Sequence, residues 1–291
     1  MPSRRAAVEG RRRRVGPPLA VASPRRPAIR VWNGARSSLR LPAVERVGKR
    51  RRRIARRPRA EDPPRGTRRR VPTLAAERRA VAAVSRRLAS SKMVPATAGN
   101  VSVRVGDLVA ITPTGANLAE LTARQVSVVD LAGRLVHGEL EPSSELGLHL
   151  GIYLEHGAGA VVHTHAPACT AVASVRDELP CIHYAMLAFG GAVPVAPYAT
   201  YGSAELAAHV VAALAGRNAT LMASHGAIAH GPTLAKAFQT MELLEWACDL
   251  YLRTLPLGEP RVLTAAQTEA VVTTSRERQY GTVKKAPKAR R

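Results

Sequence analysis

Residues 159–165 read Gly-Ala-Val-Val-His-Thr-His, a short apolar and β-branched stretch that ends in two histidines. Such a run is typical of a strand that is buried on both faces. Helical patterns stand on either side of it. One is expected to be capped by Ser143 and to end at His156-Gly157, and the next to begin at Pro167. Helices and strands therefore alternate around this stretch, which predicts an α/β fold with a layered sheet.

Upstream of this stretch the sequence predicts one helix and two strand pairs. The helix is expected over residues 73–92, with Thr73 as its N-cap and one apolar face. The strand pairs follow from apolar runs interrupted by the turn signals Gly106-Asp107 and Ala132-Gly133. Their expected ranges are 101–105 with 108–111, and 126–130 with 134–137.

Downstream of the same stretch the sequence predicts three more helices and one more buried strand. The helices are expected over residues 203–214, 234–252 and 264–279, and the strand over residues 220–223. A capping box, in which Gln267 completes Thr264, opens the last helix. In the helix that Ser143 opens, four side chains are expected to face inward: Leu146, Leu150, Tyr153 and Leu154.

The charge of the chain is concentrated at its ends. Its 291 residues carry 44 Lys and Arg against 21 Asp and Glu, a net charge of +23. Residues 1–72 hold 24 of these cations, four of the anions and ten of the 21 prolines, whereas residues 73–283 are net −2. An Arg- and Pro-rich segment cannot bury enough apolar surface to offset its ordering entropy. We therefore expect a disordered extension at 1–72, one domain at 73–283 and a basic tail at 284–291.

Composition also narrows the partners and the compartment. The basic extension holds a single aromatic residue, Trp32, so it lacks stacking groups for bases, and nucleic acid is not an expected partner. Removal of residues 1–70 is expected to leave activity intact. No run approaches the roughly 20 apolar residues of a membrane span. Three cysteines without Cys-x-x-Cys spacing indicate reduced core thiols of a cytoplasmic protein: Cys169, Cys181 and Cys248.

Three histidines have the spacing of metal ligands. His163 and His165 stand two apart in the expected strand, so both imidazoles project from one face and can hold one ion. His225 follows the strand of residues 220–223, and Glu145 lies in the first turn of the helix before the His-x-His strand. Three neutral imidazoles, a neighbouring carboxylate and an open position are the pattern of a catalytic divalent-metal site, most simply for Zn²⁺.

Other histidines have a simpler interpretation. A histidine is usually a surface residue or a satisfied core residue. That interpretation is given to five of the nine: His137, His149, His156, His209 and His230.

Small hydrogen-bond donors gather on three expected turns. These turns are Gly99-Asn100, Thr114-Gly115 and Ser143-Ser144. Backbone N–H groups at turns and at a helix start favour an anion. No Walker-type run is present, so the anion is expected to be the phosphate of a substrate.

Five motifs occur in the order of a known family. They are Thr97-Ala98-Gly99-Asn100-Val101-Ser102, Thr112-Pro113-Thr114-Gly115, Ser143-Ser144-Glu145, Val162-His163-Thr164-His165 and Ser224-His225-Gly226. Together they resemble the class II aldolase/adducin family, and within it the aldolases of fuculose 1-phosphate type. The resemblance covers about residues 73–283. It implies a three-layer α/β/α fold around a central, mostly antiparallel sheet.

The resemblance also implies an activity and a set of site residues. The activity is zinc-dependent, reversible cleavage of a ketose 1-phosphate to dihydroxyacetone phosphate and an aldehyde. His163, His165 and His225 match the ligands of one Zn²⁺ per subunit, and Glu145 matches the carboxylate at the metal that serves as general base. The substrate-phosphate pocket is matched by five residues: Asn100, Thr114, Gly115, Ser143 and Ser144.

Two tyrosines complete the site that the resemblance implies. Tyr184 matches a proton donor supplied across a subunit interface, and Tyr280 matches a C-terminal tyrosine that closes over the site. The implied assembly is a homotetramer with active sites at subunit boundaries.

Alternatives within and outside this family stay open at the level of sequence. Relatives that share the histidines include ribulose-phosphate 4-epimerases and a dehydratase, but the epimerases have an aspartate at the position of Glu145. An adducin-like binding module would have lost the metal ligands, and all three are present. The aldehyde is not identified, because Leu146-Gly147-Leu148 and Tyr201 depart from the aldolase pattern.

Overall fold

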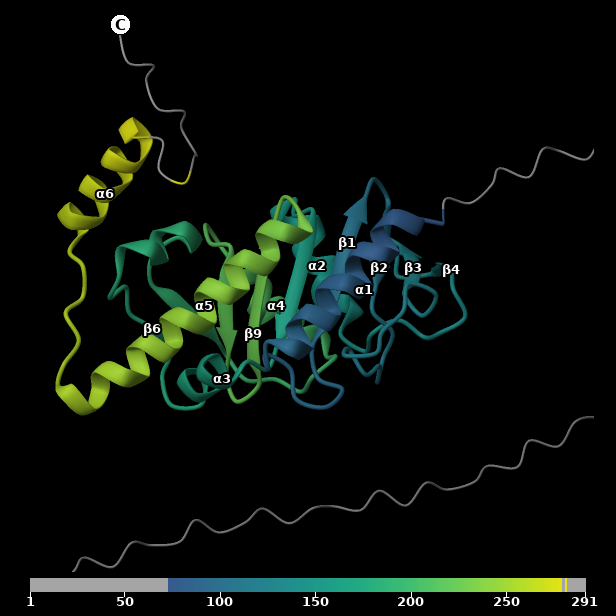
Figure 1. Ribbon diagram of the computed structural model, residues 1–291, viewed down its shortest axis with the longest axis horizontal. Coiled ribbons are helices and arrows are strands. Elements are labelled where there is room, and N and C mark those ends of the chain that lie inside the picture. Colours follow the sequence, from purple (N-terminus) through teal and green to yellow (C-terminus); the bar gives the residue numbers. More distant parts are fainter. Residues whose placement is uncertain (1–72, 279–280, 282–291) are drawn as a thin grey trace, which may run out of the picture. The chain divides into compact units, whose positions relative to one another are not determined.

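The computed structural model describes residues 73–278 and residue 281 of the chain (Figure 1). The expected extension at 1–72, the basic tail at 284–291 and Tyr280 lie outside these residues. What was expected of them, and of the domain boundaries that they define, therefore stays a prediction.

A single nine-stranded sheet runs through the described part of the chain, in the order β4-β3-β2-β1-β5-β9-β8-β7-β6. Neighbouring strands are antiparallel except for the parallel pair of β7 and β8. The expectation of a mostly antiparallel sheet is confirmed. The strands are β1 (Asn100–Val105), β2 (Leu108–Ile111), β3 (Ser127–Asp130), β4 (Leu135–His137), β5 (Ala160–Thr164), β6 (Glu178–Leu179), β7 (Val193–Ala196), β8 (Ala219–Met222) and β9 (Gly226–Gly231).

Helices cover both faces of this sheet, so the predicted three-layer α/β/α fold is confirmed. Helices α1, α3 and α5 share one apolar core with the sheet, and α2 and α4 share a second core on the opposite face (Figure 1). The helices are α1 (Ala75–Ser90), α2 (Leu146–His156), α3 (Pro167–Ala173), α4 (Ala204–Ala213), α5 (Leu234–Thr254) and α6 (Ala265–Arg278), with 3₁₀ turns η1 (Tyr184–Phe189) and η2 (Leu255–Leu257).

Strand β5 lies in the middle of the sheet and is buried at every residue. Its side chains alternate between the two layers, because successive residues of a strand point to opposite faces. Val162 belongs to the core beneath α1 and α5, whereas Val161 packs in the core beneath α2 and α4. This alternation directs His163 to the α2 face, where Glu145 lies.

Three local expectations are wrong. The N-cap of α1 is Leu74, with φ 45° and no side-chain hydrogen bond, so Thr73 does not cap it. Leu74 packs against the core, and this packing decides how the chain enters the helix. Helix α2 begins at Leu146 with Glu145 as its N-cap, so Ser143 is not the cap. Leu154 is 59% exposed, because the buried stripe of α2 centres on Ile152 and Tyr153 and turns away from it.

The capping box of the last helix is confirmed. The backbone N–H of Thr264 donates to Gln267 Oε1 at 2.8 Å, and the backbone N–H of Gln267 donates to Thr264 Oγ1 at 3.3 Å. Helix α6 buries none of its own residues and contacts η1. Within the part of the chain that the structure describes, no helix is both long and apolar enough to cross a membrane.

Candidate active site

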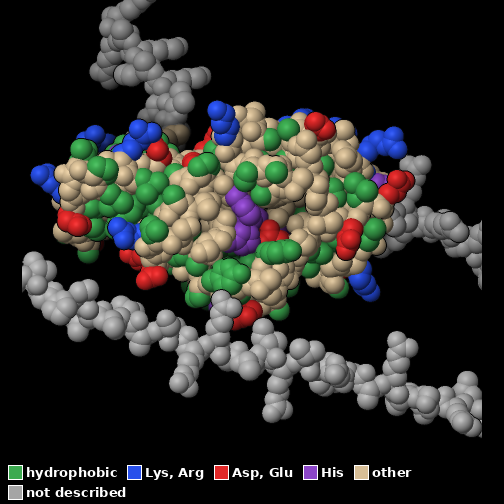
Figure 2. All heavy atoms as spheres, turned by 90° about the horizontal axis from the view of Figure 1, so that it is seen from below, with side chains coloured by type: hydrophobic (Ala, Val, Ile, Leu, Met, Phe, Trp, Pro, Cys, Tyr) green, Lys and Arg blue, Asp and Glu red, His purple; other side chains and the backbone are tan. Residues whose placement is uncertain are grey.

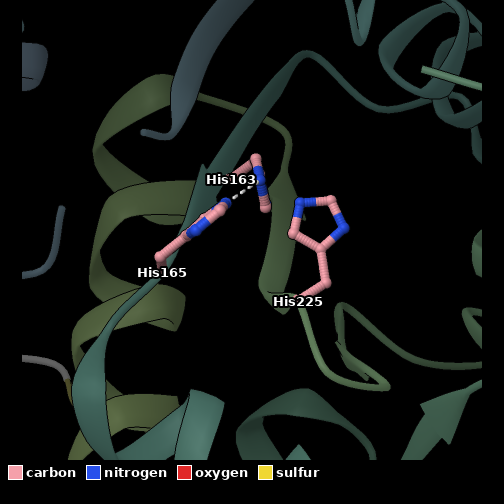
Figure 3. A group of neighbouring side chains, drawn as sticks. All are labelled: His163, His165 and His225. Atoms are coloured by element: carbon pink, nitrogen blue, oxygen red, sulfur yellow. Dashed lines mark hydrogen bonds between the residues drawn. The ribbon is translucent and has the colours of Figure 1, made fainter. Parts of the chain in front are cut away.

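The three predicted histidines converge at one end of β5. Their ligand nitrogens lie within 4.8 Å of one another, and Nε2 of His163 is 3.2 Å from Nε2 of His165. Figure 3 shows the three rings turned toward a common centre, with the ring of His225 facing the other two. Geometry of this kind suits one ion held by three imidazoles.

The backbone brings His225 to this centre through a tight turn between β8 and β9. The backbone N–H of His225 donates to the carbonyl of Met222 at 3.1 Å. Gly226 then begins β9 directly beside β5, where a Cβ atom would lie 2.3 Å from the carbonyl oxygen of Thr164. A side chain at position 226 would therefore push the turn, and His225 with it, away from β5.

A hydrogen bond fixes the tautomer of His163. Its Nδ1 lies 2.9 Å from the carbonyl oxygen of Ala227. A carbonyl oxygen only accepts, so Nδ1 carries a proton and Nε2 is the nitrogen that faces Glu145 and a metal would occupy. Burial lowers the pKa of His163, but the neighbouring carboxylate of Glu145 outweighs burial and raises it. Burial and the positive charge thus favoured on His163 lower the pKa of both His165 and His225 to about 4, so both of these rings are neutral near pH 7. Neutral imidazole is the form that binds a metal.

The carboxylate of Glu145 lies against the histidine cluster. This side chain is only 7% exposed, with Oε2 3.2 Å from His163 Nε2 and Oε1 3.4 Å from His225 Nε2. Burial raises its pKa, but His163 and a 2.8 Å hydrogen bond from Asn100 Nδ2 outweigh this effect and hold the pKa of Glu145 below its usual range. Glu145 is therefore an anion near pH 7.

The donor set fits a divalent cation. Oε1 of Glu145 is buried and makes no hydrogen bond, although it faces the imidazole of His225. A buried acceptor without a donor is unfavourable. A cation between His163, His165 and His225 would satisfy the nitrogens and the carboxylate together.

Glu145, His165 and His225 line a cavity of about 370 Å³, whereas His163 is fully buried and is not among the lining residues. Figure 2 shows histidine side chains at the surface near the middle of one face, with Lys and Arg side chains farther out. None of the described residues that line the cavity is Lys or Arg. The residues predicted to bind phosphate line the cavity together with Glu145, His165 and His225: Asn100, Thr114, Gly115, Ser143 and Ser144.

The donors that remain available in this cavity differ from those expected. Backbone N–H groups of Thr114 and Ser143 already donate to the carbonyls of Glu141 and Thr112, both at 3.0 Å. The hydroxyl of Ser143 accepts from the backbone N–H of Glu145 at 3.2 Å, so its own proton can still be donated. Hydroxyl groups, rather than these two backbone amides, are the donors that can reach an anion.

Of the two predicted tyrosines, the structure describes Tyr184 and does not bring it to this cluster within one chain. Tyr184 begins η1, is 45% exposed and does not line the cavity. Tyr280 lies outside the described residues. Two other tyrosines, Tyr198 and Tyr201, do line the cavity and are 65% and 70% exposed. We call these two the outer rim, and the four residues His163, His165, His225 and Glu145 the inner wall.

From the sequence, Tyr201 stood out only as a departure from the aldolase pattern, Tyr198 was given no role in the site, and the surroundings of His149 were not predicted. A Cβ at Gly202 would lie 2.9 Å from the carbonyl oxygen of Ser144, so this glycine lets the loop of Tyr201 approach the cavity. His149 is indeed a satisfied core residue, but its ring contacts Asn100, which in turn contacts Glu145. A spacing of four from Glu145 was the available signal.

Comparison with known proteins identifies the family. Residues 79–252 match the family described as the class II aldolase and adducin N-terminal domain. The chain belongs to the class II aldolase and adducin family. The chain is 44% identical over 178 residues to L-fuculose phosphate aldolase of Escherichia coli strain K12, which covers 60% of the chain and 82% of that protein.

Two further class II aldolases support this assignment. The 5-methylthioribulose-1-phosphate/5-deoxyribulose-1-phosphate aldolase of Rhodospirillum rubrum is 42% identical over 178 residues, 60% of this chain and 80% of its own length. A solved structure of L-fuculose 1-phosphate aldolase aligns with a TM-score of 0.67 and 34% identity, covering 69% of this chain and 96% of its own. The chain is thus a class II aldolase, a carbon–carbon lyase of a metal-dependent family.

Proposed function

We propose that this chain is a zinc-dependent aldolase that reversibly cleaves a ketose 1-phosphate to dihydroxyacetone phosphate and an aldehyde. The observation that carries the proposal is the inner wall: a buried carboxylate and three convergent imidazoles open into a cavity lined by hydroxyl donors. His163, His165 and His225 would hold the metal, with Glu145 beside it. Three imidazoles with a neighbouring open position are typical of catalytic Zn²⁺.

The metal would supply Lewis-acid polarisation of the substrate carbonyl, which stabilises the negative charge that develops during cleavage. Lysine chemistry offers no alternative in this cavity. The described part of the chain contains Lys92 and Lys236, and both are exposed and absent from the cavity wall. An imine mechanism, which needs a lysine at the substrate carbonyl, is therefore not supported.

Glu145 is the group that would move the proton on carbon. In the condensation direction the carboxylate takes a proton from the hydroxymethyl carbon of dihydroxyacetone phosphate, and in cleavage the protonated carboxyl returns that proton to C3 after the bond between C3 and C4 has broken. Its low pKa makes it an anion ready to accept a proton. Its hydrogen bond from Asn100 orients the carboxylate toward the cavity.

The substrate phosphate would bind in the same cavity, beside the inner wall. Thr114 and Ser144 contribute hydroxyl groups there, and Asn100, Gly115 and Ser143 line the same region. No described Lys or Arg lines the cavity, so the metal is the main positive charge available to the dianionic substrate.

The tyrosines would complete the site through assembly. Tyr184 is exposed and distant from the inner wall of its own chain, as expected of a residue that serves the site of a neighbouring subunit in a homotetramer. There it would exchange a proton with the C4 hydroxyl oxygen of the ketose, which is the aldehyde oxygen after cleavage. Tyr280 would close over the bound substrate.

A coupled assay for dihydroxyacetone phosphate release tests this function. The panel would contain L-fuculose 1-phosphate, 5-methylthioribulose 1-phosphate and 5-deoxyribulose 1-phosphate, because relatives are named for these substrates. Release from at least one, lost after chelation and restored by Zn²⁺, is the expected result. Isomerisation of a pentulose phosphate without release of dihydroxyacetone phosphate would instead identify a 4-epimerase.

A further inference from the structure

A chain of buried polar side chains leads from Glu145 into the core, between β1 and α2. Asn100 Nδ2 lies 2.8 Å from Glu145 Oε2, and Asn100 Oδ1 lies 2.5 Å from His149 Nε2. Behind them, Ser102 Oγ lies 2.6 Å from His149 Nδ1 and 2.5 Å from Tyr153 Oη. His149, Ser102 and Tyr153 are fully buried and do not line the cavity.

The spacing of the contacting residues along α2 is close to their spacing along β1. Glu145, His149 and Tyr153 are spaced by four residues along α2 and its N-cap, an advance of about 6 Å per step. Asn100 and Ser102 are spaced by two residues along β1, an advance of about 6.7 Å. The helix side chains therefore alternate with the strand side chains along the line of contacts.

The carboxylate of Glu145, at the cavity end of this series of hydrogen bonds, sets the direction of every hydrogen bond in the series. Glu145 is an acceptor, so Asn100 presents its NH₂ group there and its Oδ1 to His149. His149 must then donate from Nε2, which leaves Nδ1 of the neutral ring to accept from the hydroxyl of Ser102. The Ser102 oxygen in turn accepts the hydroxyl proton of Tyr153.

The titratable groups in this series of hydrogen bonds stay in the protonation states that these bond directions require. Burial and the neighbouring His163 lower the pKa of His149 to about 3, so its ring is neutral with one donor and one acceptor. Burial raises the pKa of Tyr153 above its usual range, so the phenol keeps its proton. Every donor in the chain therefore points toward Glu145.

We propose that His149 is a positioning residue for Glu145, which it orients through Asn100, while Ser102 and Tyr153 fix its tautomer. This inference rests on the proposed role of Glu145 as the base. Without the donor at Nε2, the amide of Asn100 is free to turn its oxygen toward the carboxylate, and Glu145 loses the hydrogen bond that Asn100 donates. The carboxylate would then no longer be held toward the reacting carbon.

Two substitutions at one position separate positioning from simple packing. His149→Gln keeps an NH₂ donor near the place of Nε2, whereas His149→Asn is too short to reach Asn100 and keeps a polar group only near Nδ1. His156→Asn is the matched control, because His156 lies on the same helix but does not line the cavity. Its Nε2 lies 3.0 Å from the carbonyl oxygen of Val211. Zinc content and the thermal unfolding midpoint would be measured for each variant.

The kinetic probe is dihydroxyacetone phosphate in D₂O, with the rate of proton exchange at its hydroxymethyl carbon as readout. His149→Asn should lower the maximal exchange rate by about 10- to 100-fold, as is usual when a group that orients a metal-site residue is lost. KM and zinc content should stay unchanged, and His149→Gln should recover most of the rate. Equal exchange by the wild-type protein and a folded His149→Asn variant would overturn the inference, as would equal losses in the Asn and Gln variants.

A second readout does not depend on turnover. Solid-state ¹⁵N spectra of histidine-labelled, zinc-loaded protein should show His149 protonated at Nε2, with its signal assigned by its absence from the His149→Gln spectrum. Protonation at Nδ1 instead would contradict the hydrogen-bond direction and overturn the inference. A wild-type chain that exchanges no proton would refute the proposed base, and with it the positioning role, whereas a variant-specific result refutes the positioning role alone.

Discussion

The inner wall and the outer rim of the cavity are built on different principles. His163 and Glu145 are both buried. His163 donates a hydrogen bond to the carbonyl of Ala227, and Glu145 accepts one from Asn100. Tyr198 and Tyr201 of the rim are more than half exposed. A group that holds a metal or moves a proton needs a fixed position, whereas a surface that contacts the variable end of a substrate tolerates mobility. Substitutions should therefore have steeply graded effects from the wall to the rim.

The largest effect is expected at the centre of the inner wall. His163→Ala removes the ligand whose tautomer is fixed by Ala227, and it should abolish both zinc binding and aldol cleavage. Metal analysis and the coupled assay measure the two losses, and His209→Ala, at a half-buried histidine outside the cavity, is the control. Retained zinc and activity in His163→Ala would contradict the proposed role of the inner wall in holding the metal.

Glu145→Gln should be the next most severe change. It keeps the size of the side chain and the histidine ligands but removes the base, so proton exchange should fall by a factor on the order of 10² to 10⁴. Zinc content should be close to that of the wild-type protein. Exchange into dihydroxyacetone phosphate at an undiminished rate would exclude Glu145 as the base and assign that role to another group.

A cavity hydroxyl that belongs to neither the inner wall nor the outer rim should have an intermediate effect. Thr114→Val removes a donor near the expected phosphate but keeps the shape of an exposed side chain. Loss of one hydrogen bond to a charged group corresponds to about 1.5–3 kcal/mol, or roughly a 10- to 100-fold rise in KM. Thr122→Val, at a threonine outside this cavity, is the control. A fall in kcat with KM unchanged would place Thr114 in the chemical step instead.

The smallest effect is expected at the rim. Tyr201→Phe removes one hydroxyl from a residue that is 70% exposed. The activation free energy for the best substrate should therefore change by only a few tenths of a kcal/mol, which is about a twofold change in kcat. The ranking of aldehydes in the condensation direction should shift toward apolar ones. A loss comparable to that of Glu145→Gln would show that the rim takes part in the chemistry, and the contrast with the inner wall would fail.

Local pattern was enough to predict much of this molecule. The buried strand, both hairpin-like strand pairs and the capping box of Thr264 and Gln267 depend on residues close in sequence, and all are confirmed. The start of α2 was wrong because Ser143 and Glu145 compete for the same turn. Contacts with Thr112 hold Ser143 outside the helix, which a local pattern does not reveal.

The site itself was predicted in part. His163 and His165 share a face because a strand repeats every two residues, and this rule needs no tertiary information. The role of His149 was not predicted, because it depends on a contact with Asn100, 49 positions away, and on the contact between Asn100 and Glu145. Its four-residue spacing from Glu145 and the two-residue spacing of Asn100 and Ser102 acquire significance only when α2 packs against β1.

The sequence by itself thus determined the fold class, the histidines proposed as metal ligands and the family, because each depends on short-range periodicity or on motifs in a fixed order. The tertiary structure alone decided which polar groups meet. It placed Glu145 against His163 and His225, joined it to Asn100 and His149, and left Tyr184 away from the cavity of its own chain. The physical reason is that hydrogen bonds and ion contacts act over about 3 Å, and only packing of the sheet and its helices brings distant segments that close.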